Sequence, residues 1–347
     1  MERFSATQRD EIVIVDAGAN PAQAKKISEL LGAKYGMREC TYFPDTDPFW
    51  RSEVNLRGKW VIVHQPIGIT ADGSTSDNLV RLLVAIDAIG RATADRIDLV
   101  IPYMPARQDR KSAPREPITA RMICDVIMAI GRWRLRRAIF VDLHSPQIQG
   151  FMPSGFPADP LFAGLLITDY FTHWYQERGI APKDICIVGP DLSMDKLVEQ
   201  LAIRAGLGGY AVVKKKRKSS RRTESGGMIG RVEGMHCFML DDEISTFSTG
   251  EDAVAYLLDH GAESVSMGCT HGKFVDDPLD RLSTAAIERI EASRLERLVV
   301  TNTLPWRFST PPPDKIKVID IAPFLAEVVH RSVNNLSISE MWNGIKT

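Results

Sequence analysis

The stretch MLDDEISTFSTGEDAV (residues 239–254) contains an apolar run, a hydroxyl-rich turn and a helical pattern in direct succession. The apolar run begins at Cys237 and leads into two adjacent carboxylates, Asp241 and Asp242. Backbone N–H groups at the start of a helix bind anions, and carboxylates accept hydrogen bonds from hydroxyls. The order therefore predicts a strand-end site that holds a sugar by its hydroxyls and a phosphate by the turn.

The same alternation of short apolar runs and helical patterns extends over almost the whole chain. One run, EIVIVDAG, precedes PAQAKKISELLG, which opens with Pro21 and closes on Gly32 as a helix should. Such an alternation predicts an α/β protein with mostly parallel sheets covered on both faces. We expect two doubly wound domains, 1–155 and 156–310. A final strand and helix, 311–347, are expected to pack back on the N-terminal domain.

The composition excludes several classes of function. The 347 residues are 44% hydrophobic and 25% charged, with a net charge of −1, so general nucleic-acid binding has no electrostatic support. No apolar run is long enough to span a membrane, and the first residues lack the apolar stretch of a signal peptide, which predicts a cytoplasmic protein. Five widely spaced cysteines without a C-x-x-C pattern indicate buried free thiols rather than a zinc site.

Polar segments follow four of the predicted strands, where doubly wound sheets bind their ligands. The first is MPARQDRK (104–111), in which Arg107 and Gln108 offer planar donors that suit a phosphate and a base. Taken alone, a basic loop also fits a solvated surface.

Two further strand ends carry His144, in VDLHSPQIQG, and Asp191, in IVGPDLS. The two side chains could share a Mg²⁺ ion, although Mg²⁺ mostly prefers oxygen ligands and water. A histidine at the end of a buried strand is also often structural.

The segment 212–227, VVKKKRKSSRRTESGG, is strongly basic. It fits a solvated face, a nucleic-acid patch or a flexible basic loop over a polyphosphate. The near-neutral total charge disfavours the nucleic-acid patch, and the serines and glycines favour a loop. Cations on a transferring phosphate would stabilise charge that develops in the transition state.

The stretch 239–254 has two interpretations, and both can be true together. In one, Asp241 and Asp242 accept hydrogen bonds from a ribose diol, and the hydroxyls of the following turn donate to a phosphate. In the other, Thr249 caps a helix that has Glu251 and Asp252 in its first turn.

Taken together, these stretches resemble the ribose-phosphate diphosphokinases (phosphoribosyl pyrophosphate synthetases), which have the type I phosphoribosyltransferase fold. The resemblance covers nearly the whole chain and rests on motifs in the family's order and spacing. They are VIPYMPARQDRK, FVDLHSPQIQGF, GAESVSMGCTHGKF, VVTNTLP and KIKVIDIAPFLAEVVHRS.

The resemblance implies transfer of the β,γ-diphosphate of ATP, with Mg²⁺, to the anomeric hydroxyl of ribose 5-phosphate. By position, Lys215 and Arg217 would be the catalytic cations. ATP would contact Phe43, Asp45, Asp47, Arg107, Gln108 and His144. His144 and Asp191 would hold Mg²⁺. The acceptor would contact Asp241, Asp242, Ser245, Thr246, Phe247, Ser248 and Thr249. Segment 43–58 matches the family's reach to a neighbouring subunit's adenine, which implies a homo-oligomer built from dimers, with a hexamer as one form.

The chain also departs from the family pattern. The family's 5-phosphate turn reads Asp-Thr-Gly/Cys-Gly-Thr, whereas this chain has Ser245 in place of the acid and Phe247 and Ser248 at the glycine positions. Glycine adopts φ > 0 and lets a backbone approach phosphate, which other residues do less easily. After Asp191, the family's two glycines and later arginine are Ser193, Met194 and Leu197 here.

Three hypotheses follow from these departures. In the first, the acceptor is enlarged to ADP-ribose, as in a family variant that rebuilds NAD, and Phe247 packs against the extra group. In the second, the protein is an ordinary ribose 5-phosphate enzyme with an unusual turn. In the third, it is a catalytically silent regulatory subunit, which the retention of Lys215, Arg217, His144 and the Asp pair disfavours.

Overall fold

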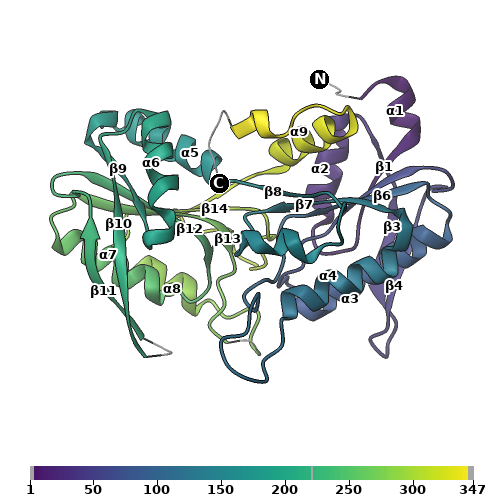
Figure 1. Ribbon diagram of the computed structural model, residues 1–347, viewed down its shortest axis with the longest axis horizontal. Coiled ribbons are helices and arrows are strands. Elements are labelled where there is room, and N and C mark those ends of the chain that lie inside the picture. The colour runs from purple at the N-terminus through teal and green to yellow at the C-terminus, as the bar shows by residue number, and fades with distance from the viewer. Residues whose placement is uncertain (1–3, 220–221, 278, 343–347) are drawn as a thin grey trace. The chain divides into compact units, whose positions relative to one another are not determined.

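The computed structural model describes residues 4–219, 222–277 and 279–342, with backbone alone at 133, 214–219, 222–226 and 342. The described chain forms two compact units. Unit 1 comprises the chain up to Leu161 together with Thr303–Arg307 and Asp320–Ile338. Unit 2 comprises Phe162–Asn302, Phe308–Ile319 and the residues from Ser339 onward. Figure 1 shows the helices and strands of both.

Unit 1 is built on a parallel sheet with the strand order β2-β1-β5-β6-β7-β8. Its sheet strands are β1 (Ile12–Asp16), β2 (Lys34–Tyr35), β5 (Trp60–His64), β6 (Arg96–Ile101), β7 (Leu135–Val141) and β8 (Ala158–Leu161). A separate antiparallel hairpin consists of β3 (Met37–Tyr42) and β4 (Pro48–Ser52). The helices are α1 (Ala6–Glu11), α2 (Pro21–Leu31), α3 (Thr75–Arg91), α4 (Thr119–Gly131) and α9 (Ala322–Val333), with 3₁₀ turns η1 (Arg132–Arg134) and η2 (Pro146–Phe151).

Helices cover both faces of the unit 1 sheet, α2 and α9 on one and α3 and α4 on the other (Figure 1). The predicted boundaries of α2 are confirmed: Pro21 is its first residue, and Gly32 ends it in the left-handed conformation at φ 67°. The sheet and helices enclose an apolar core that includes Val15, Val63 and Leu99. The sequence prediction of a parallel, doubly wound α/β arrangement is therefore confirmed for this unit.

Unit 2 is built on a second sheet with the order β11-β10-β9-β12-β13-β14-β15. Its strands are β9 (Ile185–Gly189), β10 (Gly209–Ser219), β11 (Arg222–Ile229), β12 (His236–Ile244), β13 (Ser264–Gly272), β14 (Leu298–Thr301) and β15 (Ile316–Ile319). Its helices are α5 (Gly164–Glu177), α6 (Asp195–Ala205), α7 (Ser248–Asp259) and α8 (Ala285–Ala292), with 3₁₀ turns η3 (Pro182–Asp184), η4 (Leu192–Met194) and η5 (Ser339–Trp342).

The direction of winding reverses between β9 and β12 in unit 2. From β9 the chain proceeds through α6 to β10 on one side, whereas from β12 it proceeds through α7, β13 and α8 to β14 on the other. Figure 1 shows α5 and α6 on one face of this sheet and α7 and α8 on the other. The carboxyl ends of β9 and β12 therefore flank a topological switch point, which is the usual ligand position in such sheets.

The unit boundaries differ from the expected domains at two places. The expected division at 155/156 falls before β8, but β8 stays in unit 1 because it pairs with β7, with Val141 opposite Leu161. The last strand was expected to pack back on the N-terminal domain, but β15 pairs with β14 and so belongs to the sheet of unit 2. The last helix, α9, lies in unit 1 and packs against α2.

The interpretation of 212–227 as a loop is wrong. Strands β10 and β11 form an antiparallel hairpin there, with Lys215 opposite Ser225 and Arg217 opposite Thr223. Residues 214–226 are charged residues, serine, threonine or glycine, without the alternation of apolar and polar residues that marks a strand, which explains the error.

Within the described residues, no helix combines the length and the apolar character that a membrane crossing requires. All five cysteines are free thiols, and Cys124, Cys186, Cys237 and Cys269 are buried, as the sequence predicts.

Candidate functional site

Strand β12 carries Asp241 and Asp242 past the end of its neighbour. β9 pairs with β12 as far as Met239, whereas β13 pairs with it as far as Ile244. Both aspartates are half-buried. They therefore lie within β12, not after it as expected, but on the part that extends beyond β9 at the switch point.

The two aspartates place negative charge next to a buried thiol. Asp241 is in register with Cys269 of β13. Burial first, and then the charges of Asp241 and Asp242, raise the pKa of the Cys269 thiol. Two adjacent carboxylates favour hydroxyl donors or a cation over an anion as ligands.

A buried ion pair stabilises the base of this strand end. Glu243 Oε2 lies 2.8 Å from Lys273 Nζ, and the two side chains are only 7% and 12% exposed. The carbonyl of Ile244 also accepts hydrogen bonds from the backbone N–H groups of Lys273 and Phe274. Removing one partner of a buried pair would leave an uncompensated charge, so the pair is costly to break. These contacts therefore hold residues 243 and 244 in place, directly before the next segment.

The next segment, residues 245–249 (the 245–249 turn), holds Phe247 in the left-handed conformation at φ 67° and ψ −3°. This conformation is the one that glycine adopts most readily, so the backbone of the turn has the shape that a glycine there would give. The ring is 3% exposed and lies against Gly250 of α7. The hypothesis that Phe247 packs against an enlarged acceptor is therefore wrong, because its ring is buried inside unit 2.

Helix α7 begins two residues earlier than the capping interpretation predicts. Its first residue is Ser248 and its N-cap is Phe247, without a side-chain cap, so Thr249 does not cap the helix. Instead, the hydroxyls of Thr246 and Ser248 lie 3.0 Å apart and hydrogen-bond to each other. Ser248 and Thr249 are exposed at the helix N-terminus. Hydroxyls and amides at a helix N-terminus form a suitable binding site for a phosphate.

Asp191 follows β9 on the other side of the switch point. Its Oδ1 accepts hydrogen bonds from the backbone N–H of Ser193, at 2.9 Å, and from the Ser193 hydroxyl. It is the N-cap of η4. Ser193 thus supports the carboxylate, while Asp191 keeps its second oxygen for other partners.

Lys215 and Arg217 lie in β10, the neighbour of β9, two positions apart. Only their backbone belongs to the described part of the chain. Their assignment as catalytic cations therefore stays a prediction.

In unit 1, Arg107 and Gln108 lie in the loop between β6 and α4. Arg107 is exposed. The Gln108 amide donates to the carbonyl of Arg110, at 3.0 Å, and lies 3.4 Å from Glu116 Oε2. Glu116 in turn accepts hydrogen bonds from the backbone N–H groups of Ser112 and Ala113, which lower its pKa. Gln108 therefore supports the shape of the loop, a role that sequence reasoning did not predict.

His144 follows β7 and is exposed. It comes two residues after Asp142, which has the unusual φ of 38° at the strand end. Such a conformation in a non-glycine residue costs energy and is common near functional sites. His144 belongs to unit 1 and Asp191 to unit 2. A Mg²⁺ ion shared by the two stays a prediction.

The candidate adenine-contacting residues lie at the tip of the β3–β4 hairpin. Phe43 donates its N–H to the carbonyl of Asp47 at 2.8 Å, and the tip also includes Asp45. The Phe43 ring is 54% exposed and contacts Phe49 edge-on, with centroids 5.6 Å apart. The hairpin is attached to the sheet by Trp50, whose indole N–H donates to the carbonyl of Asp16.

Sequence reasoning missed a buried polar cluster at the switch point of unit 1, between β1 and β5. Asp16 is fully buried, accepts hydrogen bonds from the Tyr35 hydroxyl and the Gly18 N–H, and has its pKa raised by burial. Gln65 accepts from the N–H of Ala19. These groups satisfy one another, so the cluster has a structural explanation.

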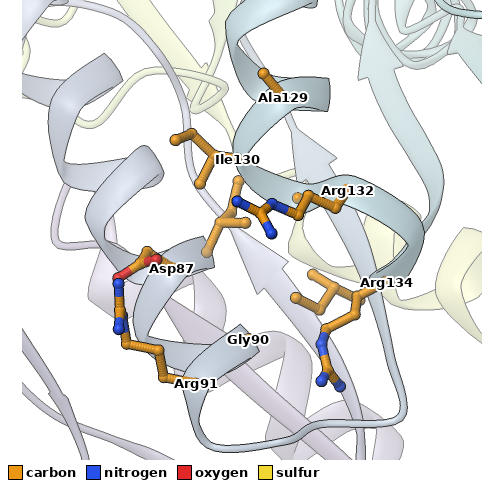
Figure 2. A pocket seen from close by; sticks show the side chains of 10 residues that line it. Asp87, Gly90, Arg91, Ala129, Ile130, Arg132 and Arg134 are labelled. Carbon is orange, nitrogen blue, oxygen red and sulfur yellow. The ribbon is translucent and has the colours of Figure 1, made fainter.

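A cavity of about 310 Å³ lies between the C-terminal turns of α3 and α4 (Figure 2). Its rim carries Arg91, Arg132 and Arg134. Arg91 pairs with Asp87, as Figure 2 shows, and Arg134 donates to the carbonyl of Ala94. Cations at helix C-termini complement the helix dipole, which accounts for these arginines without a ligand. None of the predicted site residues lines this cavity.

The donor chemistry of the candidate residues can be compared with what a metal ion requires. In the described ranges, no three His, Cys, Asp or Glu side chains gather to hold a metal by themselves. Mg²⁺ on a nucleotide needs only one or two carboxylates beside the phosphate oxygens and water. The carboxylates of Asp191, Asp241 and Asp242 fit this donor requirement better than the imidazole of His144 does.

Known proteins resemble this chain over nearly its whole length. The N-terminal domain of ribose phosphate pyrophosphokinase matches residues 12–131, and the phosphoribosyl synthetase-associated domain matches residues 212–343. The ribose-phosphate pyrophosphokinase of Hyphomonas neptunium is 36% identical over 95% of this chain and 99% of its own. That of Fusobacterium nucleatum is 35% identical over 96% and 99%.

Among solved structures, phosphoribosylpyrophosphate synthetase from Mycobacterium smegmatis superposes with a TM-score of 0.77. It is 30% identical and covers 94% of this chain and 99% of its own. The predicted phosphoribosyltransferase-type fold is therefore confirmed. Together with the strand-end carboxylates and the left-handed turn before α7, these similarities show that the chain belongs to the ribose-phosphate pyrophosphokinase family of enzymes.

Proposed function

We propose that the protein transfers the β,γ-diphosphate of ATP to the anomeric hydroxyl of a 5-phosphorylated ribose and releases AMP. The observation that carries the proposal is the carboxyl end of β12. There, two carboxylates, a left-handed turn and the start of α7 follow one another within nine residues at a topological switch point. The family to which the chain belongs supports the same activity.

Each part of this strand end has a chemical task in the proposal. Asp241 and Asp242 accept hydrogen bonds from the ribose hydroxyls and so orient the sugar. The 245–249 turn and the first N–H groups of α7 bind the 5-phosphate. With both ends of the sugar held, the anomeric hydroxyl is presented to the β-phosphorus of ATP, and positioning supplies much of the rate enhancement.

The remaining residues are assigned to ATP and to the migrating group. Lys215 and Arg217 stabilise the charge of the diphosphate as it moves, which requires no covalent intermediate. Arg107 and His144 bind the nucleotide, and Asp191 holds its Mg²⁺, which when bound neutralises phosphate charge. Gln108 acts by shaping the loop that carries Arg107.

The exposed ring of Phe43 supports a shared adenine site. A large aromatic side chain at a protruding hairpin tip is suited to stack on a base. We assign the tip, with Asp45 and Asp47, to the adenine of a neighbouring subunit. This assignment makes the active protein a homo-oligomer built from dimers.

Two acceptors are compatible with the 245–249 turn. Ribose 5-phosphate is favoured by the left-handed conformation of Phe247, because the turn keeps the backbone shape that a glycine would give. ADP-ribose is the second candidate, and it is favoured by Ser245 and Ser248, which replace an acid and a glycine with neutral hydroxyls. ADP-ribose carries the same free anomeric hydroxyl on its distal ribose, so the chemistry would be unchanged.

The deciding experiment is AMP release from Mg²⁺–ATP, with ribose 5-phosphate and ADP-ribose offered separately and the products identified by mass. We expect phosphoribosyl pyrophosphate from the first acceptor. A diphosphorylated ADP-ribose with little phosphoribosyl pyrophosphate would assign the enlarged acceptor instead. No AMP with either sugar would contradict the proposal and would favour the catalytically silent subunit, which should then co-purify with an active relative.

A further inference from the structure

We propose that Arg289 and Asp276 are positioning residues that orient the backbone of the 245–249 turn toward the 5-phosphate of the acceptor. The inference rests on the proposed function, because it concerns the phosphate end of the same site. All of the residues involved belong to unit 2.

A single guanidinium connects the turn to a carboxylate. Arg289 Nη1 donates to the backbone carbonyl of Thr246 and lies 3.1 Å from Asp276 Oδ1. The Arg289 and Asp276 side chains are 35% and 20% exposed, so the pair is partly shielded from solvent. Hydrogen bonds that involve an ionised group are stronger than neutral ones, and this contact joins two segments that are 43 residues apart.

Helix α8 holds the backbone of Arg289 in a fixed position. The helix buries Ala286, Ile287 and Ile290, so the face next to Arg289 is packed against the rest of unit 2. A guanidinium on such a helix loses less freedom when it binds than one on an exposed loop, because its backbone is already ordered.

The contact determines which way the next amide points. In a planar trans peptide, the carbonyl of Thr246 and the N–H of Phe247 belong to one unit and point in opposite directions. When Arg289 binds the carbonyl, the N–H of Phe247 is directed away from the guanidinium. This N–H stands immediately before the first residue of α7, where an anion would bind.

The turn needs such support because it holds a strained residue. The left-handed conformation of Phe247 costs about 1–2 kcal/mol relative to the right-handed one. Burial of the ring against Gly250 supports the turn from within unit 2, and Arg289 supports the carbonyl side. Loss of Arg289 would therefore let the Thr246–Phe247 peptide reorient.

The test compares Arg289→Ala, Arg289→Lys and Asp276→Asn with Arg294→Ala as a matched control. Arg294 follows α8 and pairs with Asp259 at 3.2 Å, and among the described residues it forms no hydrogen bond or ion pair with the turn. We expect Arg289→Ala to raise the KM for the ribosyl phosphate about tenfold or more. The KM for ATP should change less than about twofold, because the residues assigned to ATP do not belong to the 245–249 turn. Arg289→Lys, which keeps one donor, should recover part of the loss, and Asp276→Asn should show a smaller effect.

Hydrogen exchange of a peptide spanning the turn provides a readout that does not depend on activity. Arg289→Ala should raise exchange at 245–249 while exchange within β12 stays unchanged, and Arg294→Ala should change neither. Unaltered exchange at the turn, or equal rises in both KM values, would overturn the positioning role. If the unmodified enzyme releases no AMP with any ribosyl phosphate, the proposed function fails, and the exchange data still decide whether Arg289 orients the turn.

Discussion

The ring of Phe247 lies directly against the backbone of Gly250. A Cβ atom on Gly250 would come within 2.7 Å of Phe247 Cε2 and 2.8 Å of Cδ2, both closer than real contacts allow. Phe247 is 3% exposed and Gly250 is buried in the first turn of α7. The 245–249 turn therefore contains a bulky residue whose ring fits only because the first turn of the following helix has a glycine at position 250.

We predict that Gly250→Ala lowers the free energy of unfolding by about 1–3 kcal/mol. Alanine would normally stabilise a helix by about 1 kcal/mol relative to glycine. Here the clash with the ring should make the same substitution destabilising. Urea denaturation measures the change. A more stable Gly250→Ala variant would contradict the contact.

A double-mutant cycle separates this contact from general effects on the helix. Phe247→Ala removes the ring and should itself destabilise the protein by about 3–5 kcal/mol. In that background we expect Gly250→Ala to become neutral or stabilising, because the clash is gone. Equal effects of Gly250→Ala in both backgrounds would show that the two residues do not interact.

Lys215 is predicted to act on the migrating diphosphate. Lys215→Ala should lower kcat by about a hundredfold or more, with an unchanged melting temperature, because the loss concerns charge in the transition state. Arg217→Ala should behave similarly. Lys216, which lies between them and carries the same charge, is the matched control, and Lys216→Ala should keep most of the activity. Equal losses in all three variants would point to a general charge effect instead.

The parts of the fold that were predicted correctly are those with local signals. The helix Pro21–Leu31 has its own start and stop residues, and the apolar runs before each helix specify parallel strands without further information. The carboxylates of β12 were likewise found because they adjoin such a run. The local sequence pattern is sufficient to predict a helix or strand where the apolar residues repeat with the period of that element and are buried.

The missed features depend on tertiary contacts. The sequence indicates that Phe247 stands at a glycine position, but not that its ring turns inward against Gly250, because that depends on the packing of α7. Arg289 lies in an ordinary amphipathic helix pattern, and nothing near it in the sequence marks Thr246 as its partner. The basic hairpin was interpreted as a loop because residues 214–226 carry no alternation of apolar and polar residues that would indicate paired strands.

Phe43 tests the shared adenine site. Phe43→Ala should raise the KM for ATP about tenfold, since stacking of an aromatic ring on a base contributes about 1–3 kcal/mol. Phe43→Tyr should retain most of the affinity. The melting temperature should not fall, because the ring is 54% exposed. Met122→Ala, which alters a similarly exposed apolar side chain on α4, is the control. An unchanged KM for ATP in Phe43→Ala would exclude the stacking role.

Asp98 makes the stability of unit 1 depend on pH. It lies in β6 in register with Arg137 and is 4% exposed. Burial raises the pKa of Asp98 to about 6, although the charge of Arg137 acts in the opposite direction. In the unfolded chain the carboxyl titrates near its ordinary value of 3.8. Between these two values the folded state keeps a proton that the unfolded state has lost, so the free energy of unfolding falls as pH rises.

We therefore predict that Asp98→Asn is more stable than the unmodified protein above pH 6 and loses this advantage toward pH 4. The difference should approach about 3 kcal/mol at neutral pH, which is the difference of about two between the folded and unfolded pKa values, converted to free energy. Urea denaturation at several pH values between 4 and 7 measures it, and Asp95→Asn, at an exposed carboxylate paired with Arg96, is the control. A difference that stays constant across this range, or that grows as pH falls, would show that Asp98 does not titrate in this way.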